Sequence, residues 1–377
     1  MKERTLFRIF LPALFAFILS GCGDDGGLWS PGKPLAKDNV KISILHITDP
    51  LSETSGYSYA HEMGIRAMRK ELGLADDQII HKVNIIDFEP ADVENAIRDS
   101  IAQGANIIIA TSWGYMDVCE KLSAEFPHVV FAHASGYKRN DTNFTNYFGR
   151  IYQARYLSGI AAGLKTRTNK IGYVAAMGKD NSEVTGGLNA FAMGVERVNP
   201  AAKIYVRITN SWFDPMSETA FAHALIVEGC DVIGQHCDTA NPQLEAEKAG
   251  VWGIGYNSDM GIDAPKAVLT SVIWNWGVYY TYLVRGIIDG TFTTGPYLGG
   301  LAEGMVDITP LNRDLAGPGT GEAIEAERKR ITREGFGIFE RPLYTNAGAA
   351  VDGKDGPLPD SEILTGISWY YRNIVEP

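Results

Sequence analysis

Short apolar segments alternate with stretches of helical periodicity along most of the chain, and this alternation occurs twice. Such segments are typical of strands buried on both faces of a parallel sheet, with the intervening helices supplying right-handed crossovers. The sequence therefore predicts an α/β protein with two doubly wound lobes side by side. The predicted strands are residues 41–47, 83–88, 106–110, 129–134, 170–177, 202–208, 231–236 and 251–256, and helices are predicted near 182–197, 217–228 and 241–249.

The N-terminal residues have the pattern of an export signal. Basic residues precede an apolar run over 9–19, which is about half of the ~20 residues that a membrane-spanning helix needs. Residues 1–21 are therefore predicted to be a signal peptide. The sequence Leu-Ser-Gly-Cys at 19–22 resembles the lipobox of bacterial lipoproteins, so Cys22 is the predicted lipidation site and 22–37 a flexible tether. An ordinary signal peptide with a chance cysteine is the alternative.

The composition argues against several classes of function. A net charge of −11 disfavours a surface for nucleic acids or anionic membranes. The sequence has no HExxH motif, no Gly-x-Ser-x-Gly elbow and no phosphate-binding loop after the first strand. We therefore expect no enzymatic activity, no cofactor and no metal. Cys230 and Cys237 flank an extended segment of ~23 Å, too long for a disulfide, and Cys119 is expected in a helix as a core residue.

Candidate binding residues follow the predicted strands, because ligands of such sheets bind beyond the carboxyl ends of the strands. Rings supply stacking surface, and carboxylates and amides fix the hydrogen-bonding edge of a ligand. The pattern predicts a small, flat, polar ligand held between the lobes. The candidates are Tyr57, Trp113, Tyr115, Trp212, Phe213, Asp238, Asp259, Trp274 and Asn275.

The aromatic candidates each have a structural alternative. Tyr57 can pack at the hinge instead of contacting a ligand. Trp113 and Tyr115 can belong to the core or to the rim of the site. For the adjacent pair Trp212 and Phe213, we expect one ring to face the ligand and the other to face the core.

The polar candidates have alternatives as well. Asp238 can cap the helix that starts near Asn241. Asp259 can cap a following turn. Asn275 lies at a predicted crossing between the lobes, where a structural role is as well supported as ligand contact.

The order of several short motifs resembles the basic membrane protein family, the substrate-binding lipoproteins of ABC importers, several of which take purine nucleosides or nucleobases. The resemblance covers roughly 41–312, with further matching pieces at 337–343 and 369–371. The motifs are Gly-Tyr-x-Tyr at 56–59, Ala-Thr-Ser-Trp-Gly-Tyr-Met-Asp at 110–117, Gly-Tyr-Val at 172–174, Trp-Phe-Asp-Pro at 212–215, Ser-Asp at 258–259 and Leu-Thr-Ser at 269–271.

The resemblance implies the fold of type I periplasmic binding proteins, with three hinge crossings, expected near Thr145, Asn275 and Gly299. The implied division of the chain is 38–145 with 275–298 for lobe one, 146–274 with 299–345 for lobe two, and 346–377 as a terminal segment packed on lobe two.

The resemblance also implies roles for individual residues. Tyr57 matches an aromatic that stacks on one face of a purine, and Trp212 or Phe213 matches the ring from the opposite lobe. Asp259 matches a carboxylate that holds ribose hydroxyls in nucleoside binders. Two positions depart from those binders: Trp274 replaces a lysine, and Ser135 stands where an aspartate meets the edge of the base. The departure at Trp274 removes a ribose contact and therefore favours a free nucleobase over a nucleoside.

The function expected from the resemblance is capture of a purine-like nucleobase or nucleoside for an ABC permease. The protein is expected to be a monomer, anchored by lipid at Cys22 in the periplasm or on the outer face of the membrane. The alternative is a sensory receptor that signals to a membrane kinase or a chemoreceptor, because the fold alone does not separate import from sensing.

Overall fold

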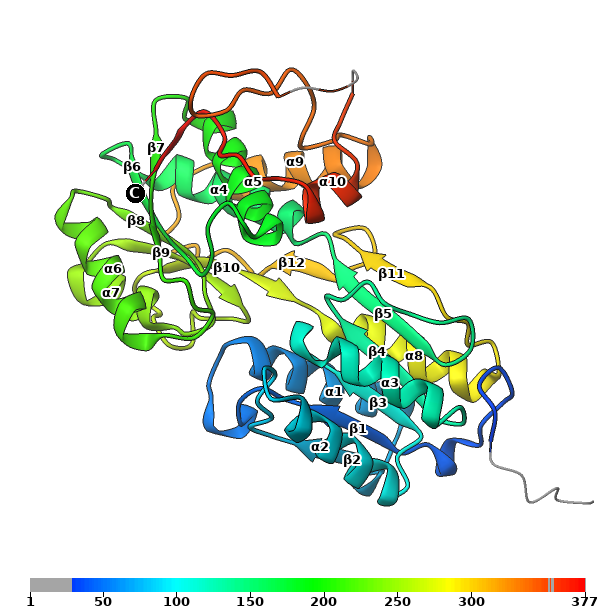
Figure 1. The fold of residues 1–377 in the computed structure, drawn as a ribbon. Helices are drawn as coiled ribbons and strands as arrows, with labels where there is room; N and C mark the ends of the chain where they lie inside the picture. The colour runs from blue at the N-terminus through cyan, green and yellow to red at the C-terminus, as the bar shows by residue number, and fades with distance from the viewer. Residues whose placement is uncertain (1–28, 352, 354–355, 377) are drawn as a thin grey trace, which may run out of the picture.

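The computed structural model describes residues 29–351, 353 and 356–376, which form two lobes around two separate sheets (Figure 1). The predicted signal peptide and Cys22 lie outside the described residues. The first sheet is parallel throughout, in the order β11-β5-β4-β3-β1-β2. Its strands are β1 (Ile42–Leu45), β2 (Ile79–Lys82), β3 (Ile107–Ala110), β4 (Val130–Ala134), β5 (Phe144–Gly149) and β11 (Pro296–Gly299).

The second sheet has the order β12-β10-β9-β8-β6-β7-β13, and only the pairing of β12 with β10 is antiparallel. The predicted fold class, two doubly wound parallel-sheet lobes, is thus confirmed. The strands are β6 (Lys170–Ala175), β7 (Lys203–Ile208), β8 (Val232–His236), β9 (Trp252–Asn257), β10 (Val268–Trp274), β12 (Val306–Ile308) and β13 (Ile374–Val375).

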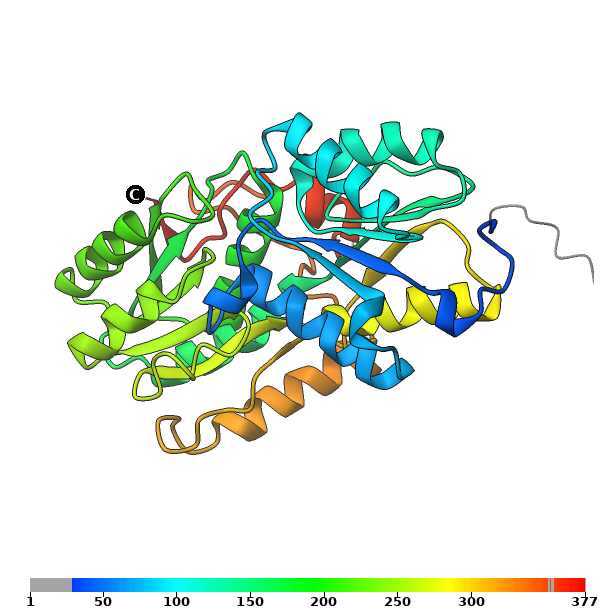
Figure 2. The same ribbon diagram turned by 90° about the horizontal axis from the view of Figure 1, so that it is seen from below.

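Helices connect the strands and pack beside the sheets (Figure 2). The strands are wholly buried where helices cover both faces, as in β3, whose sequence is Ile-Ile-Ile-Ala. The helices of the first lobe are α1 (Tyr57–Leu72), α2 (Pro90–Ala102), α3 (Met116–Glu125) and α8 (Trp276–Asp289). Those of the second are α4 (Ile151–Lys165), α5 (Ser182–Val198), α6 (Pro215–Val227), α7 (Asn241–Ala249), α9 (Thr320–Arg333) and α10 (Asp360–Thr365).

One predicted strand is wrong. Residues 83–88 form a loop, and the second strand of the first lobe is β2, which pairs with β1 from Ile79 onward. Asn84 has a φ of 57°, a left-handed conformation that asparagine adopts more readily than most residues and that ends an extended run. Of the apolar residues after it, Ile85 packs against the core of the first lobe from a loop, whereas Ile86 and Phe88 are exposed.

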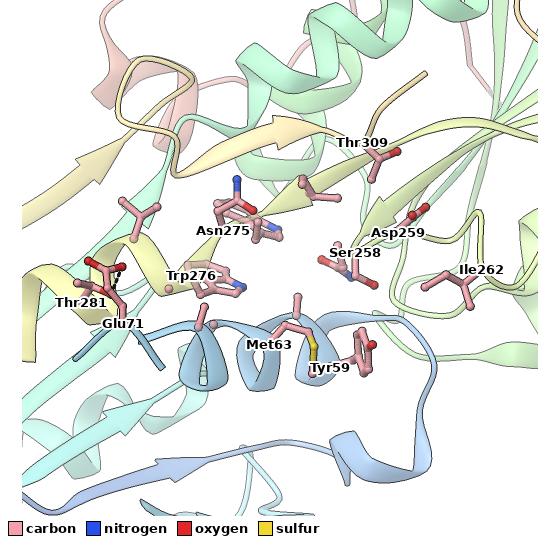
Figure 3. A pocket seen from close by; sticks show the side chains of 18 residues that line it. Tyr59, Met63, Glu71, Ser258, Asp259, Ile262, Asn275, Trp276, Thr281 and Thr309 are labelled. Atoms are coloured by element: carbon pink, nitrogen blue, oxygen red, sulfur yellow. Dashed lines mark hydrogen bonds between the residues drawn. The ribbon is translucent and has the colours of Figure 1, made fainter. Parts of the chain in front are cut away.

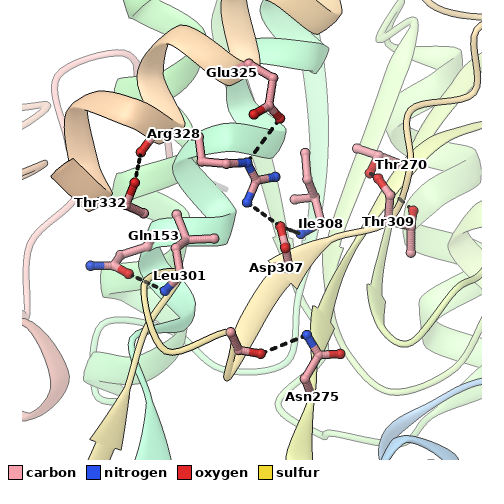
Figure 4. Close-up of polar contacts among 11 residues, drawn as sticks. Gln153, Thr270, Asn275, Leu301, Asp307, Ile308, Thr309, Glu325, Arg328 and Thr332 are labelled. Carbon is pink, nitrogen blue, oxygen red and sulfur yellow. Dashed lines mark hydrogen bonds and ion pairs between the residues drawn. The ribbon is translucent and has the colours of Figure 1, made fainter. Parts of the chain in front are cut away.

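The chain passes between the lobes at three places. The β5 strand stays in the first sheet up to Gly149, the chain leaves the second sheet after Trp274 at the end of β10, and it returns between β11 and β12. Figure 4 shows how the last two passages are joined: Asn275 Nδ2 donates to the carbonyl of Gly304 at 2.9 Å. On β12, Asp307 pairs with Arg328 of α9 at 2.6 Å. The lobe boundaries given above stay a prediction.

Candidate functional site

The two lobes touch at the loop that precedes α1. The backbone N–H of Gly56 donates to Ser258 Oγ at 3.0 Å, and Thr54 Oγ1 donates to Asp263 Oδ1 at 2.5 Å. Gly56 has a φ of 111°, and a Cβ atom at this position lies only 2.9 Å from the carbonyl oxygen of Asp238. Because glycine alone fits this conformation and this approach, it lets the first lobe come against the carboxyl edge of the second sheet.

Tyr57, the first residue of α1, lies at this junction. Its hydroxyl donates to the carbonyl of Thr111 at 2.5 Å, which fixes the ring on the first lobe. Burial raises the pKa of Tyr57 well above its ordinary value, and nearby Tyr147, Glu183 and Asp238 raise it further. Gly56, the residue before Tyr57, approaches the backbone of Asp238, so Tyr57 lies at the edge that faces the second lobe.

A stack of rings runs behind Tyr57 across the hinge. The Trp274 and Trp276 rings are 4.6 Å apart, those of Trp276 and His61 are 4.2 Å apart, and both pairs are tilted by only 12°. Tyr57 meets His61 edge to face at 4.5 Å. Since Trp274 ends β10 and His61 belongs to α1, the stack joins the second sheet to the first lobe.

The second lobe places buried polar groups on its side of the junction. His236 ends β8, and neither of its ring nitrogens has a hydrogen-bond partner among the described residues. Burial, and then the charge of Arg155, hold the pKa of His236 well below its ordinary value, so the ring is neutral. Glu183, at the start of α5, lies 3.7 Å from His236 Nε2, and burial raises the pKa of Glu183 to about 7.

Asp238 adds a second carboxyl group. Burial raises the pKa of Asp238 to about 8, although Asn257 Nδ2 donates to its Oδ1 at 2.9 Å and opposes the shift. Asp238 does not cap α7, whose N-cap residue is Ala240 and has no side-chain cap. A carboxyl group that keeps its proton near pH 7 can donate as well as accept a hydrogen bond. We call Tyr57, Arg155, Glu183, His236 and Asp238 the interlobe site.

A groove of about 510 Å³ lies beside the interlobe site, between α1 and the end of the second sheet (Figure 3). Tyr59 and Met63 of α1 line one side of it. Three predicted binding residues, Asp259, Trp274 and Asn275, line the groove, whereas Tyr57 does not. Asp259 is exposed and accepts a hydrogen bond from the backbone of Gly261 at 2.9 Å, so it does form the turn cap considered above.

The other aromatic candidates lie in different environments. Trp212 is half-buried, and its ring lies 5.8 Å from the ring of His236, beside the interlobe site. Phe213 is 54% exposed. Trp113 is 55% exposed and contacts Tyr137 at 5.8 Å, whereas Tyr115 is fully buried in the first lobe.

Tyr115 and Ser135 are both engaged within the first lobe. The hydroxyl of Tyr115 donates to the carbonyl of Ile85 at 2.8 Å. Ser135 has a φ of 62° after β4 and donates its hydroxyl to the carbonyl of Ala134 at 2.6 Å. These contacts are local, so the geometry brings Tyr57, Trp212 and Asp238 together and leaves Tyr115 apart from them.

Sequence reasoning did not single out Arg155, Glu183 or His236. His236 is the last residue of a predicted strand, so the rule that binding groups follow strands points to its neighbourhood. Glu183 lies at the start of a predicted helix. Arg155 lies within α4, which was not among the predicted helices, and no spacing in the sequence connects it to β8, whose Gln235 carbonyl it contacts at 2.5 Å.

Within the described ranges, no helix has the length and the apolar character that crossing a bilayer requires. Cys119, Cys230 and Cys237 are buried and free. The last two therefore do not form a disulfide, as their predicted separation indicated.

Comparison with known proteins finds similar sequences and similar structures among solute-binding proteins. A purine-binding protein of Brucella abortus is 31% identical over 349 residues, which are 92% of this chain and 96% of that protein. A putative ABC transporter glucose-binding protein of Haloferax volcanii is 34% identical over 341 residues, which are 87% of this chain and 83% of that protein. An ABC solute-binding protein structure from Conexibacter woesei, 19% identical, has a TM-score of 0.67 and covers 79% of this chain and 97% of that one.

The Conexibacter structure supports the type I periplasmic-binding-protein fold. Residues 42–335 match the family model described as Bmp, ABC transporter substrate-binding protein PnrA-like. This match spans more than half of the chain and agrees with the resemblance found in the motifs. The chain therefore belongs to the Bmp family of ABC transporter substrate-binding proteins.

Proposed function

We propose that this protein captures a purine-like nucleobase or nucleoside between its two lobes by aromatic stacking and delivers it to an ABC permease. The observation that carries the proposal is the position of Tyr57, which directly follows the contacts of Gly56 with Ser258 and with the backbone of Asp238 on the second lobe. A flat ligand stacked there meets a ring on one side and hydrogen-bonding groups on the other. The name of the Brucella abortus relative, a purine-binding protein, supports the same ligand class.

Binding and closure are coupled in this proposal. Contacts from both lobes to one ligand exist together only when the lobes are closed, so the ligand shifts the population toward the closed form. The hydrogen bond from Gly56 to Ser258 and that from Thr54 to Asp263 form between the lobes in the same arrangement. We propose that the permease recognises the closed form.

We favour a free base over a nucleoside. Trp274, which stands where nucleoside binders carry a lysine, is only 4% exposed, and its indole N–H donates to the hydroxyl of Tyr256 at 3.3 Å. A packed indole with its donor already engaged cannot replace a flexible ammonium as a contact for ribose hydroxyls. Asp259, the other residue matched to ribose recognition, is exposed on the groove.

A sugar is the second candidate ligand, because the Haloferax volcanii relative is named as a putative glucose-binding protein and is 34% identical. Calorimetric titration of the purified protein with hypoxanthine, adenine, inosine and glucose separates the two. We expect the free bases to bind, inosine to bind more weakly than hypoxanthine, and glucose not to bind. Binding of glucose with none of the purines overturns the proposed ligand class.

We also propose that the protein is a lipoprotein held at the cell envelope through Cys22, which the lipobox-like sequence before it indicates. Expression of the full chain with a labelled fatty acid tests this. Wild type is expected to incorporate the label and Cys22→Ser is not. Equal labelling of both contradicts the assignment of Cys22.

A further inference from the structure

Arg155 is a buried cation that the fold leaves partly unsatisfied. The side chain has no exposed surface, and Nη1 donates to the carbonyl of Gln235 at 2.5 Å. Among the described residues, Nε and Nη2 form no hydrogen bond, although the Tyr173 ring lies beside the guanidinium, 5.9 Å from its carbon atom. A guanidinium stays charged in proteins, and a buried charge without acceptors is costly. A ligand that brings acceptors to these nitrogens removes that cost.

The guanidinium borders the interlobe site. Its carbon atom lies 4.0 Å from the centre of the Tyr256 ring, a cation–π contact that holds the group in place. Its charge also acts on Glu183 and on His236. Tyr256 and Glu183 in turn act on Tyr57 across the junction. The Tyr256 ring also lies 4.7 Å from the ring of His236, so Arg155 borders the polar side of the site through Tyr256.

The chemistry of the guanidinium limits which purine edge it can meet. It offers only donors, in a planar fork. A 6-oxopurine presents two neighbouring acceptors, O6 and N7, and arginine binds this pair in a bidentate manner. Adenine instead presents a donor, its 6-amino group, beside the acceptor N7. The amino group would face the donors of arginine unfavourably, and this donor–acceptor pair suits asparagine or glutamine instead.

We propose that Arg155 is the specificity-determining residue of the interlobe site and that it selects 6-oxopurines by donating to their O6 and N7 atoms. This assignment rests on the proposed binding of a purine between the lobes.

A ligand series on the wild-type protein tests the assignment without any substitution. By calorimetry, hypoxanthine is expected to bind roughly tenfold to a hundredfold more tightly than adenine. 7-Deazahypoxanthine lacks the N7 acceptor and is expected to bind more weakly than hypoxanthine. Equal or tighter binding of adenine overturns the role of Arg155 while leaving the proposed purine site intact. Failure of every purine to bind overturns the proposed function itself, and this assignment with it.

A pair of variants tests the residue directly. Arg155→Gln replaces a donor fork by one donor and one acceptor, so the ratio of hypoxanthine to adenine affinity is expected to fall to one or below. The control is Arg167→Gln, which removes an exposed arginine of the same lobe and should leave the ratio unchanged. Thermal unfolding establishes that each variant is folded. A folded Arg155→Gln protein with the wild-type ratio overturns the proposal, and if it does not fold, the ligand series decides.

Discussion

The first lobe brings mainly rings to the junction between the lobes, whereas the second brings charged and titratable groups together with the rings of Trp212 and Tyr256. Tyr57 is fixed by its bond to Thr111, and His61 is bonded to Tyr280 through Nδ1 at 2.5 Å, so these rings are held before any ligand binds. Among the described residues, buried nitrogens without a hydrogen-bond partner occur in both lobes, at His61 and Trp276 of the first and at His236 and Arg155 of the second, but the second lobe also supplies a cation and two buried carboxyl groups. We infer that the first lobe supplies most of the stacking surface and that the second lobe supplies the hydrogen bonds that distinguish ligands.

The largest expected effect tests the polar side of this comparison through pH. With a pKa of about 8 in the folded protein against ~3.9 in an unfolded chain, Asp238 keeps a proton that the unfolded chain loses. The free energy of unfolding should therefore fall as pH rises from about 4 to 8, by about 1 kcal/mol per pH unit. Asp238→Asn, neutral at every pH, should show a shallower fall when denaturant unfolding is measured across this range.

Asp259→Asn is the matched control, because Asp259 is exposed and accepts a hydrogen bond from the backbone of Gly261 in a local turn. Its pH dependence should equal that of wild type. If the free energy of unfolding depends on pH identically in Asp238→Asn and in wild type, the Asp238 carboxyl group is ionised in the folded protein. The interlobe site would then lack a neutral carboxyl donor.

The next largest effect tests stacking on the ring that the first lobe supplies. Tyr57→Ala should weaken purine binding by about 1–3 kcal/mol, the range found when a base loses an aromatic partner. Tyr57→Phe keeps the ring and loses only the bond to Thr111, so its affinity should stay close to that of wild type. Titration calorimetry on both variants measures this difference. If alanine and phenylalanine have the same effect, stacking is not the contribution of Tyr57.

The smallest effect concerns the ring expected from the second lobe. Trp212 lies beside His236 and is half-buried, whereas Phe213 is exposed. Trp212→Ala should reduce affinity by about 1 kcal/mol, and Phe213→Ala should change it little, as competition binding can measure. A larger loss for Phe213→Ala would exchange the roles of the two rings.

Much of the fold was predictable because its strands are short and buried on both faces. The run Ile-Ile-Ile-Ala of β3 lies between two helical segments. It is too short for a helix and rich in β-branched residues, which is typical of a buried strand. The prediction of a strand at 83–88 was wrong, because the left-handed conformation of Asn84 turns an apolar run into a loop. Apolar content alone does not distinguish these two outcomes.

The site was predictable only in part. Tyr57 and Asp238 follow strands, and the rule that ligands bind at strand ends makes both of them candidates. Arg155 reaches the same place from within α4, eighty residues from the Gln235 carbonyl that it contacts. The raised pKa of Asp238 and the neutral state of His236 arise from burial, which appears only when the lobes are in place.

The central claim is that one planar heterocycle lies between the rings of the first lobe and the polar groups of the second. Its most direct test is mass spectrometry of the small molecule released when purified wild-type protein is denatured, with Tyr57→Ala protein purified in parallel. We expect a purine-like heterocycle from wild type and much less of it from the variant. Release of a sugar or an amino acid, or equal purine release from both proteins, would contradict the claim.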